Sequence, residues 1–153
     1  MSSKMPGSSE AIAAAAPLLG TWRLNLGKSD YRAVPWSPPR SITLTFLAPR
    51  EGEARFTVDE VPASGPSIHI EWAGKYNGKD YPATGSIYFD SVAMKRASAR
   101  TMDWTLKKGG QLAFTATSSV SQDDETLTMT FTGKDPQGET TTEVQVYDKE
   151  LTP

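Results

Sequence analysis

The sequence contains a single histidine, His69, with an acidic residue, Glu71, two positions later. Side chains two positions apart on a β-strand point to the same side, so this pair would stand on one wall. A histidine titrates near neutral pH and serves as a general acid or base. The two residues are therefore the candidate catalytic pair if their side faces the interior. The apolar residues Ile68, Ile70 and Trp72 alternate with them, which favours a solvent-facing histidine instead.

Arg96 is the second residue whose side chain is a candidate for a role in a functional site. It shares the parity of Val92 and Met94, so the alternation predicts that it points toward the apolar side of its strand. A buried guanidinium needs a partner. The ring of Trp22 would provide one through a cation–π contact. The carboxylate of an anionic ligand, held by two hydrogen bonds, would provide another.

Large apolar side chains form a third group, because they recur on one face of the expected strands. Such side chains either fill a small barrel or line a cavity within it. Tyr31 and Trp36 lie in a proline-rich segment that would cover the opening or simply anchor the loop. The candidate ligand-binding residues are Phe46, Phe56, Trp72, Met94, Arg96, Trp104, Phe114, Met129, Tyr31 and Trp36.

Other classes of site are not expected from this composition. The chain has no cysteine and one histidine, so we expect no metal site, and no cofactor motif is present. The 16 basic and 18 acidic residues are spread along the chain, which argues against nucleic acid as a partner. No apolar run approaches the roughly 18 residues that a membrane-spanning helix needs.

The elements that would position these residues are β-strands. Apolar and polar residues alternate with period two from Gly20 onward, and short turn sequences separate the runs. An apolar-faced meander covers that face and removes its edges by closing on itself. We predict an all-β fold, a closed antiparallel up-and-down barrel of about 8–10 strands. The expected strands lie near 21–26, 41–48, 53–61, 66–75, 82–88, 91–97, 101–107, 111–120, 125–132 and 140–148.

The ends of the chain and its connections complete the organisation. Residues 1–19 are predicted to form a flexible arm and residues 20–153 a single domain. The apolar stretch 11–19 lacks a preceding basic region, so we expect no signal peptide and a cytoplasmic location. Asn77-Gly78 is the strongest predicted hairpin turn. The one long connection, residues 27–40, is predicted to be a lid-like loop rather than a helix.

The motif Gly20-Thr21-Trp22 resembles the G-x-W opening of lipocalins and related calycins. The chain is further similar to a group of bacterial lipocalin-like domains of unassigned function. That similarity rests on GTWRLNLGKS (20–29), AGKYNGKDYPATG (73–85), the segments 94–96 and 106–110, and YDK (147–149). It covers most of residues 20–149. The resemblance implies a lipocalin-like barrel in which the tryptophan closes the base with an arginine across its ring; it implies no particular chemistry.

Three functions remain open at this point. The first is a carrier or sensor that binds a small hydrophobic molecule in the barrel cavity. The second is a cofactor-independent cyclase or isomerase that acts on a hydrophobic biosynthetic intermediate, for which inward-facing acid or base groups beside apolar walls would be the sign. The third is a protein-interaction module with a packed core and an exposed apolar patch.

Overall fold

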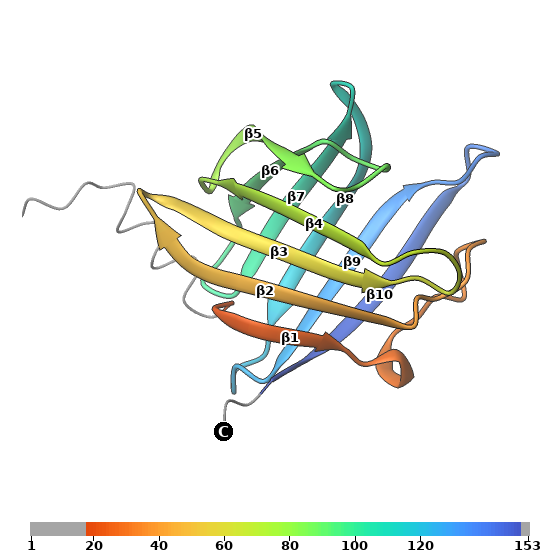
Figure 1. Cartoon of the computed structure of the whole chain (residues 1–153), viewed down its shortest axis with the longest axis horizontal. Helices are drawn as coiled ribbons and strands as arrows, with labels where there is room; N and C mark the ends of the chain where they lie inside the picture. Colours follow the sequence, from red (N-terminus) through yellow and green to blue (C-terminus); the bar gives the residue numbers. More distant parts are fainter. Residues whose placement is uncertain (1–17, 151–153) are drawn as a thin grey trace, which may run out of the picture.

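The computed structural model describes residues 18–150, which form a closed barrel of ten antiparallel strands (Figure 1). The predicted fold class is confirmed. Each strand pairs with its neighbours in sequence, and β1 pairs with β10 to close the ring. The strands are β1 (Gly20–Leu24), β2 (Ser41–Arg50), β3 (Glu53–Val61), β4 (Ile68–Gly74), β5 (Asn77–Thr84), β6 (Ser91–Arg96), β7 (Thr101–Lys108), β8 (Gln111–Val120), β9 (Thr126–Lys134) and β10 (Thr140–Lys149).

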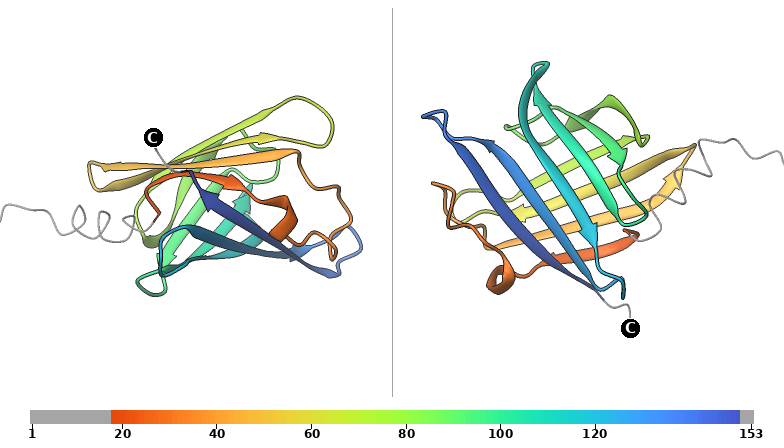
Figure 2. Two further views of the ribbon diagram at one scale, coloured as in Figure 1. Left: turned by 90° about the horizontal axis from the view of Figure 1, so that it is seen from below. Right: turned by 180° about the vertical axis from the view of Figure 1, so that it is seen from behind.

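The antiparallel order gives the barrel two different ends. The connections β1–β2, β3–β4, β5–β6, β7–β8 and β9–β10 lie at one end, which we call the distal end. The start of β1, the end of β10 and the other connections lie at the opposite, terminal end. Figure 2 shows this arrangement from two further sides, with β1 and β10 next to each other at the seam.

The core follows from the alternation in the sequence. The predicted inward positions of five strands are buried, including Phe46 on β2, Phe56 on β3, Ile70 on β4, Trp104 on β7 and Met129 on β9. Opposed residues on antiparallel neighbours share a face, so each buried strand face imposes its phase on the next. Phe46 pairs with Phe56, and Phe56 pairs with Trp72, which brings three aromatic rings together.

The fifth strand differs from the prediction. β5 spans Asn77–Thr84 rather than 82–88, and the chain turns at Lys75–Tyr76, just before the predicted Asn77-Gly78 turn. Gly85 explains the end of the strand: it has a φ of 99°, and a Cβ there would lie 1.9 Å from the carbonyl oxygen of His69. The chain can pass β4 this closely only with glycine.

The long connection after β1 is mainly loop, as predicted. It opens with one 3-10 turn, η1 (Leu26–Lys28), whose start is capped by the side chain of Asn25. The backbone of Asp30 then pairs with that of Val144 on β10, so the connection follows the seam before it crosses to β2. The part of the predicted arm formed by residues 1–17 lies outside the described residues. Within residues 18–150, no helix is both long and apolar enough to cross a bilayer.

Candidate functional site

The interior of the barrel is polar along one strand, β10. Its inward positions hold Thr141, Glu143, Gln145 and Tyr147, all less than a tenth exposed. Val144 and Val146 point outward. Pairing with β9 imposes this orientation: Tyr147 opposes Leu127, Gln145 opposes Met129 and Glu143 opposes Phe131. Those β9 residues face the core, so their partners must face it as well.

Hydrogen bonds connect the side chains of Glu143, Gln145 and Tyr147 into a row, which we call the polar file. The Tyr147 hydroxyl donates to Gln145 Oε1 over 2.5 Å, and Gln145 Nε2 donates to Glu143 Oε2 over 2.5 Å. The indole Nε1 of Trp36 donates to the other Glu143 oxygen, Oε1, over 2.7 Å. Glu143 thus accepts one hydrogen bond on each carboxylate oxygen, one from β10 and one from the loop. The polar file follows β10 from Glu143, in the distal half of the strand, to Tyr147, near the terminal end.

A second carboxylate, Glu60, faces the same end. It is in phase with the buried residues Ala54 and Phe56 of β3 and opposes Ile42 and Ile68 on the neighbouring strands. Burial raises the pKa of Glu60, and the charge of Glu143 raises it further.

Burial also raises the pKa of Glu143, although hydrogen bonds from Trp36 and Gln145 act in the opposite direction. Two inward carboxylates that both resist ionisation form an acid pair at the distal end of the barrel. Such a pair can hold and transfer a proton, or can bind a positively charged or hydrogen-bond-donating group.

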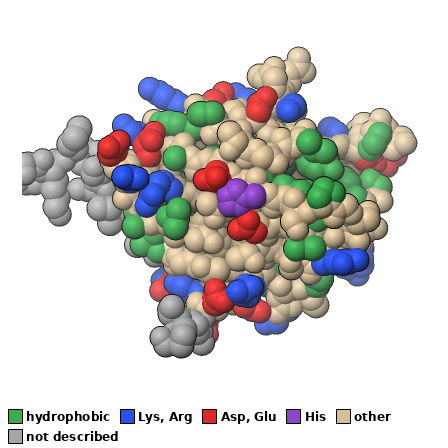
Figure 3. Space-filling view, in the orientation of Figure 1, with side chains coloured by type: hydrophobic (Ala, Val, Ile, Leu, Met, Phe, Trp, Pro, Cys, Tyr) green, Lys and Arg blue, Asp and Glu red, His purple; other side chains and the backbone are tan. Residues whose placement is uncertain are grey.

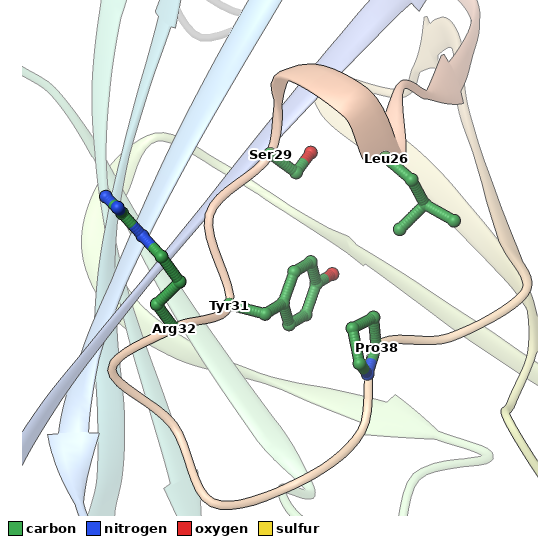
Figure 4. A pocket seen from close by; sticks show the side chains of 5 residues that line it. All are labelled: Leu26, Ser29, Tyr31, Arg32 and Pro38. Carbon is green, nitrogen blue, oxygen red and sulfur yellow. The ribbon is translucent and has the colours of Figure 1, made fainter.

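The connection between β1 and β2 covers this pair. Trp36 reaches Glu143 from it while its side chain remains 49% exposed. The Tyr31 hydroxyl is buried without a hydrogen-bond partner, and burial together with the charge of Glu143 raises its pKa. Figure 4 shows the Tyr31 ring between Ser29 and Pro38, in a hollow of about 390 Å³. A second hollow, of about 300 Å³, includes Glu60 in its lining, but the outward side chains of Thr43, Asp59 and His69 line it as well, so it lies on the outer face of the sheet.

An aromatic wall extends from the acid pair into the barrel. Phe131, which opposes Glu143, lies 5.8 Å from Phe114, and Phe114 lies 5.8 Å from Phe89, measured between ring centroids. Phe89 lies 6.3 Å from Trp72, which also stacks on Phe56 and meets Trp104 edge-on. These edge-to-face and stacked contacts are the favourable geometries for aromatic pairs.

The predicted catalytic pair lies elsewhere. His69 and Glu71 are on the outer face of β4, and Figure 3 shows the histidine at the surface beside acidic side chains. His69 Nδ1 lies 2.5 Å from Asp59 Oδ1, and Nε2 lies 3.2 Å from Glu71 Oε2. The hydrogen bond to Asp59 is the main reason why the pKa of His69 is raised. The inward orientation that their catalytic role requires is therefore not met, and the surface position matches the alternative drawn from the alternation.

Arg96 is not on the apolar side, contrary to its parity. It is the last residue of β6, it is exposed, and its Nε donates to the Ser98 carbonyl over 3.0 Å. The strand ends there at the rim of the barrel, so the side chain escapes into solvent. The ring of Trp22 is instead covered by Lys149, whose Nζ lies 5.4 Å from the ring centroid. Trp22 itself is fully buried and donates to the Leu18 carbonyl over 2.8 Å.

The other predicted ligand-binding residues fall into two places. Tyr31 and Trp36 lie together in the connection at the distal end. Seven residues face the barrel interior, some fully buried and two, Trp72 and Phe114, only partly so. They are Phe46, Phe56, Trp72, Met94, Trp104, Phe114 and Met129.

The sequence analysis did not single out Glu60, Glu143, Gln145 and Tyr147. The parity that Glu60 shares with Ala54 and Phe56 was sufficient to place it inward, whereas the alternation on β10 pointed the wrong way. On β10 the valines at 144 and 146 give an apolar face, and that face points outward. The signal that would have found the polar file is the pairing with β9, because Leu127 and Met129 are inward and impose the phase of β10.

Comparisons with known proteins provide little more. No family model matches the sequence, and no curated protein matches it. Among solved structures, the chain is similar to a redesigned β-barrel, with 15% sequence identity, a TM-score of 0.49, and coverage of 92% of this chain and 96% of that chain. The strand pairings themselves show that the chain is a ten-strand antiparallel closed barrel, and the comparisons assign no family to it.

Proposed function

We propose that the protein binds a small hydrophobic molecule, which enters the barrel at its distal end beneath the β1–β2 connection. The observation that carries this proposal is the acid pair, Glu60 and Glu143, placed at the start of a continuous aromatic wall. An apolar surface with a few convergent polar groups is the usual composition of a small-molecule site. The resemblance of the G-x-W opening to that of lipocalin-like barrels supports the same function.

The surface at the distal end supports entry there. Six of the seven large hydrophobic residues that are exposed among residues 18–150 lie in its connections or at adjoining strand ends. These six are Leu26, Trp36, Val61, Ile87, Tyr88 and Leu112. An apolar rim favours the approach of an apolar molecule to this end of the barrel.

The test is native mass spectrometry of the purified protein under gentle and under denaturing conditions. A mass excess that disappears on denaturation is expected, and it would give the mass of the bound molecule. A bare mass, combined with no change in the tryptophan fluorescence when hydrophobic probes are added, would contradict the proposal. That result would support an interaction module with a packed core.

A second candidate function is a cofactor-independent cyclase or isomerase. It is favoured by the acid pair itself, because two neighbouring carboxylates with raised pKa values can exchange a proton with a bound molecule. One carboxyl group would donate a proton to the substrate while the other carboxylate removes one, so that the product has the same mass. A molecule recovered from the protein would be returned to fresh protein and followed by chromatography. Conversion that is lost in Glu143→Gln would support catalysis, and unchanged ligand would support a carrier.

A further inference from the structure

The charged side chains that face the barrel interior at the distal end are acidic. Glu60 and Glu143 face the interior there, and Lys108, the basic residue of inward parity at that end, is exposed as the last residue of β7. Arg96 and Lys149, which also have inward parity on their strands, lie at the terminal end. An anionic ligand would therefore meet two carboxylates without a counter-charge, whereas a cationic ligand would relieve their mutual repulsion.

The covering connection does not supply the missing positive charge. Its three basic residues, Lys28, Arg32 and Arg40, are all exposed. Arg32 has a side chain that is 90% exposed and ion-paired with Asp30 over 2.8 Å. Figure 4 shows this side chain directed away from the Tyr31 ring.

A nitrogen donor is already bound to Glu143, one of the two carboxylates of the acid pair. The indole Nε1–H of Trp36 is held on Glu143 at 2.7 Å, from a side chain that is half exposed and belongs to a loop. A ligand N–H group could replace this donor with the same geometry if the loop moved outward. A protonated amine would make the stronger contact, because hydrogen bonds between two charged groups are stronger than those with a neutral donor.

The wall next to the acid pair also suits a cation with an apolar body. Phe131 opposes Glu143 directly, and its ring is followed by those of Phe114 and Phe89. Phe114 and Phe131 are only partly buried, so their surfaces are not wholly used by packing within the core. Aromatic faces attract cations and also bury hydrocarbon surface.

We propose that the ligand of this site is a hydrophobic amine. Its protonated nitrogen binds between Glu60 and Glu143 in place of the Trp36 indole, and its apolar body lies along the wall formed by Phe131, Phe114 and Phe89. This inference rests on the proposed function and adds the chemical class of the ligand. It differs from one of the two alternatives drawn from Arg96, that of a ligand with a carboxylate.

The experiment compares three probes of similar size by isothermal titration calorimetry at neutral pH: 2-(1-naphthyl)ethylamine, 2-(1-naphthyl)ethanol and 1-naphthylacetate. The amine is expected to bind at least about tenfold more tightly than the alcohol, and the acid most weakly, because close charge pairs contribute this much or more. Trp36→Phe removes the competing N–H and is expected to raise the affinity for the amine about tenfold.

Variants then locate the preference. In Glu143→Gln and in Glu60→Gln the ratio of amine to alcohol affinity should fall, and in the double variant it should approach one. Glu139→Gln, which changes an exposed acidic residue just before β10, is the matched control and should keep the wild-type ratio. Thermal unfolding of each variant verifies that it is folded.

The outcomes separate the two proposals. Equal or tighter binding of the alcohol or the acid would overturn the amine assignment and leave the hydrophobic-ligand proposal standing. A preference that survives in the double variant would overturn the assignment of the nitrogen to the acid pair. If neither the wild type nor Trp36→Phe binds any of the three probes at about 1 mM, a weak limit for any specific site, both proposals are contradicted.

Discussion

At the scale of single residues, the environment of each acid or base decides its chemistry more than its type does. His69 has the intrinsic pKa of a catalyst, but it lies on the outer face between two carboxylates, where water surrounds it. Glu143 is an ordinary strand residue by sequence, and burial inside the barrel makes it a carboxyl group that resists ionisation. The chemistry of this molecule is therefore concentrated at the acid pair.

The pKa of His69 is expected to depend mainly on Asp59. Asp59→Asn should lower it clearly, and Glu71→Gln should lower it less, because the hydrogen bond to Asp59 is the largest cause of the increase. The stabilisation from this cluster is fully present below the unfolded-state pKa, about 6.5, and is lost as pH rises through the raised folded-state pKa. An NMR titration of the single histidine ring measures these values. A larger effect from Glu71→Gln would show that the hydrogen-bond assignment is wrong.

The stability of the protein should also depend on the ionisation of Glu143. Its pKa is higher in the folded state than the ordinary 4.5, so the stability that it contributes is complete below about pH 4.5 and is lost as pH rises through the folded-state pKa. Glu143→Gln cannot ionise, so its free energy of unfolding should fall less than that of the wild type across this range. Urea unfolding at several pH values measures the difference. Parallel pH profiles for the variant and the wild type would contradict the prediction, and Glu139→Gln provides the surface control.

At the scale of elements, close passages of the chain determine where strands end. The β5–β6 connection contacts the backbone of β4 at Gly85, and β5 begins next to Gly78, which also has a positive φ of 77°. Both glycines have a positive φ, 77° at Gly78 and 99° at Gly85, but their surroundings differ. Replacing each by alanine therefore separates two contributions to the free energy of unfolding: the strain of a positive φ, and the steric overlap of a Cβ with the β4 backbone.

Gly85→Ala should destabilise the protein much more than Gly78→Ala. A Cβ at Gly78 would meet nothing within 4 Å, so the cost should be only that of the left-handed conformation, about 1–2 kcal/mol. At Gly85 the same strain adds to a backbone overlap at 1.9 Å, so we expect a further loss of at least about 1 kcal/mol. Chemical unfolding of both variants measures this difference. Equal losses of unfolding free energy in the two variants would mean that the β4 backbone at His69 moves away from the new Cβ at no measurable cost.

At the scale of the whole molecule, the barrel is closed by pairings of very different length. β9 and β10 pair over nine residues each, from Thr140–Lys134 to Asp148–Thr126. The seam between β1 and β10 is much shorter, from Trp22–Lys149 to Leu24–Tyr147, and β4 pairs with β5 only at Glu71–Thr84 and Trp72–Ala83. Short ladders leave the ring with two weaker joints on nearly opposite sides.

These joints should open before the rest of the barrel. Amides of β1 and β5 are expected to exchange with solvent faster than those of β3, β7 and β9, because local opening follows the number of ladder hydrogen bonds that must break. Hydrogen–deuterium exchange with peptide-level or NMR detection measures this order. Uniform protection around the ring would show that the barrel opens only by global unfolding.

The period-two pattern by itself determined most of the architecture. Alternation is local, because successive side chains of a strand point to opposite faces, and it therefore identified the ten strands and interior residues such as Phe56 and Trp104. The need to cover an apolar face and remove strand edges then led to closure. Only β5 was misplaced, since its end depends on a contact between Gly85 and β4 that is distant in the sequence.

The tertiary structure alone decided the candidate site. The phase of β10 depends on its register with β9, which turns Glu143 inward and Val144 outward. From polarity alone, the valine would be expected inside and the glutamate outside. The exposure of Arg96 depends on where the rim of the barrel lies, and the contact of Trp36 with Glu143 joins residues 107 positions apart. Such features arise from pairing and loop closure between distant segments, which a pattern within one strand does not contain.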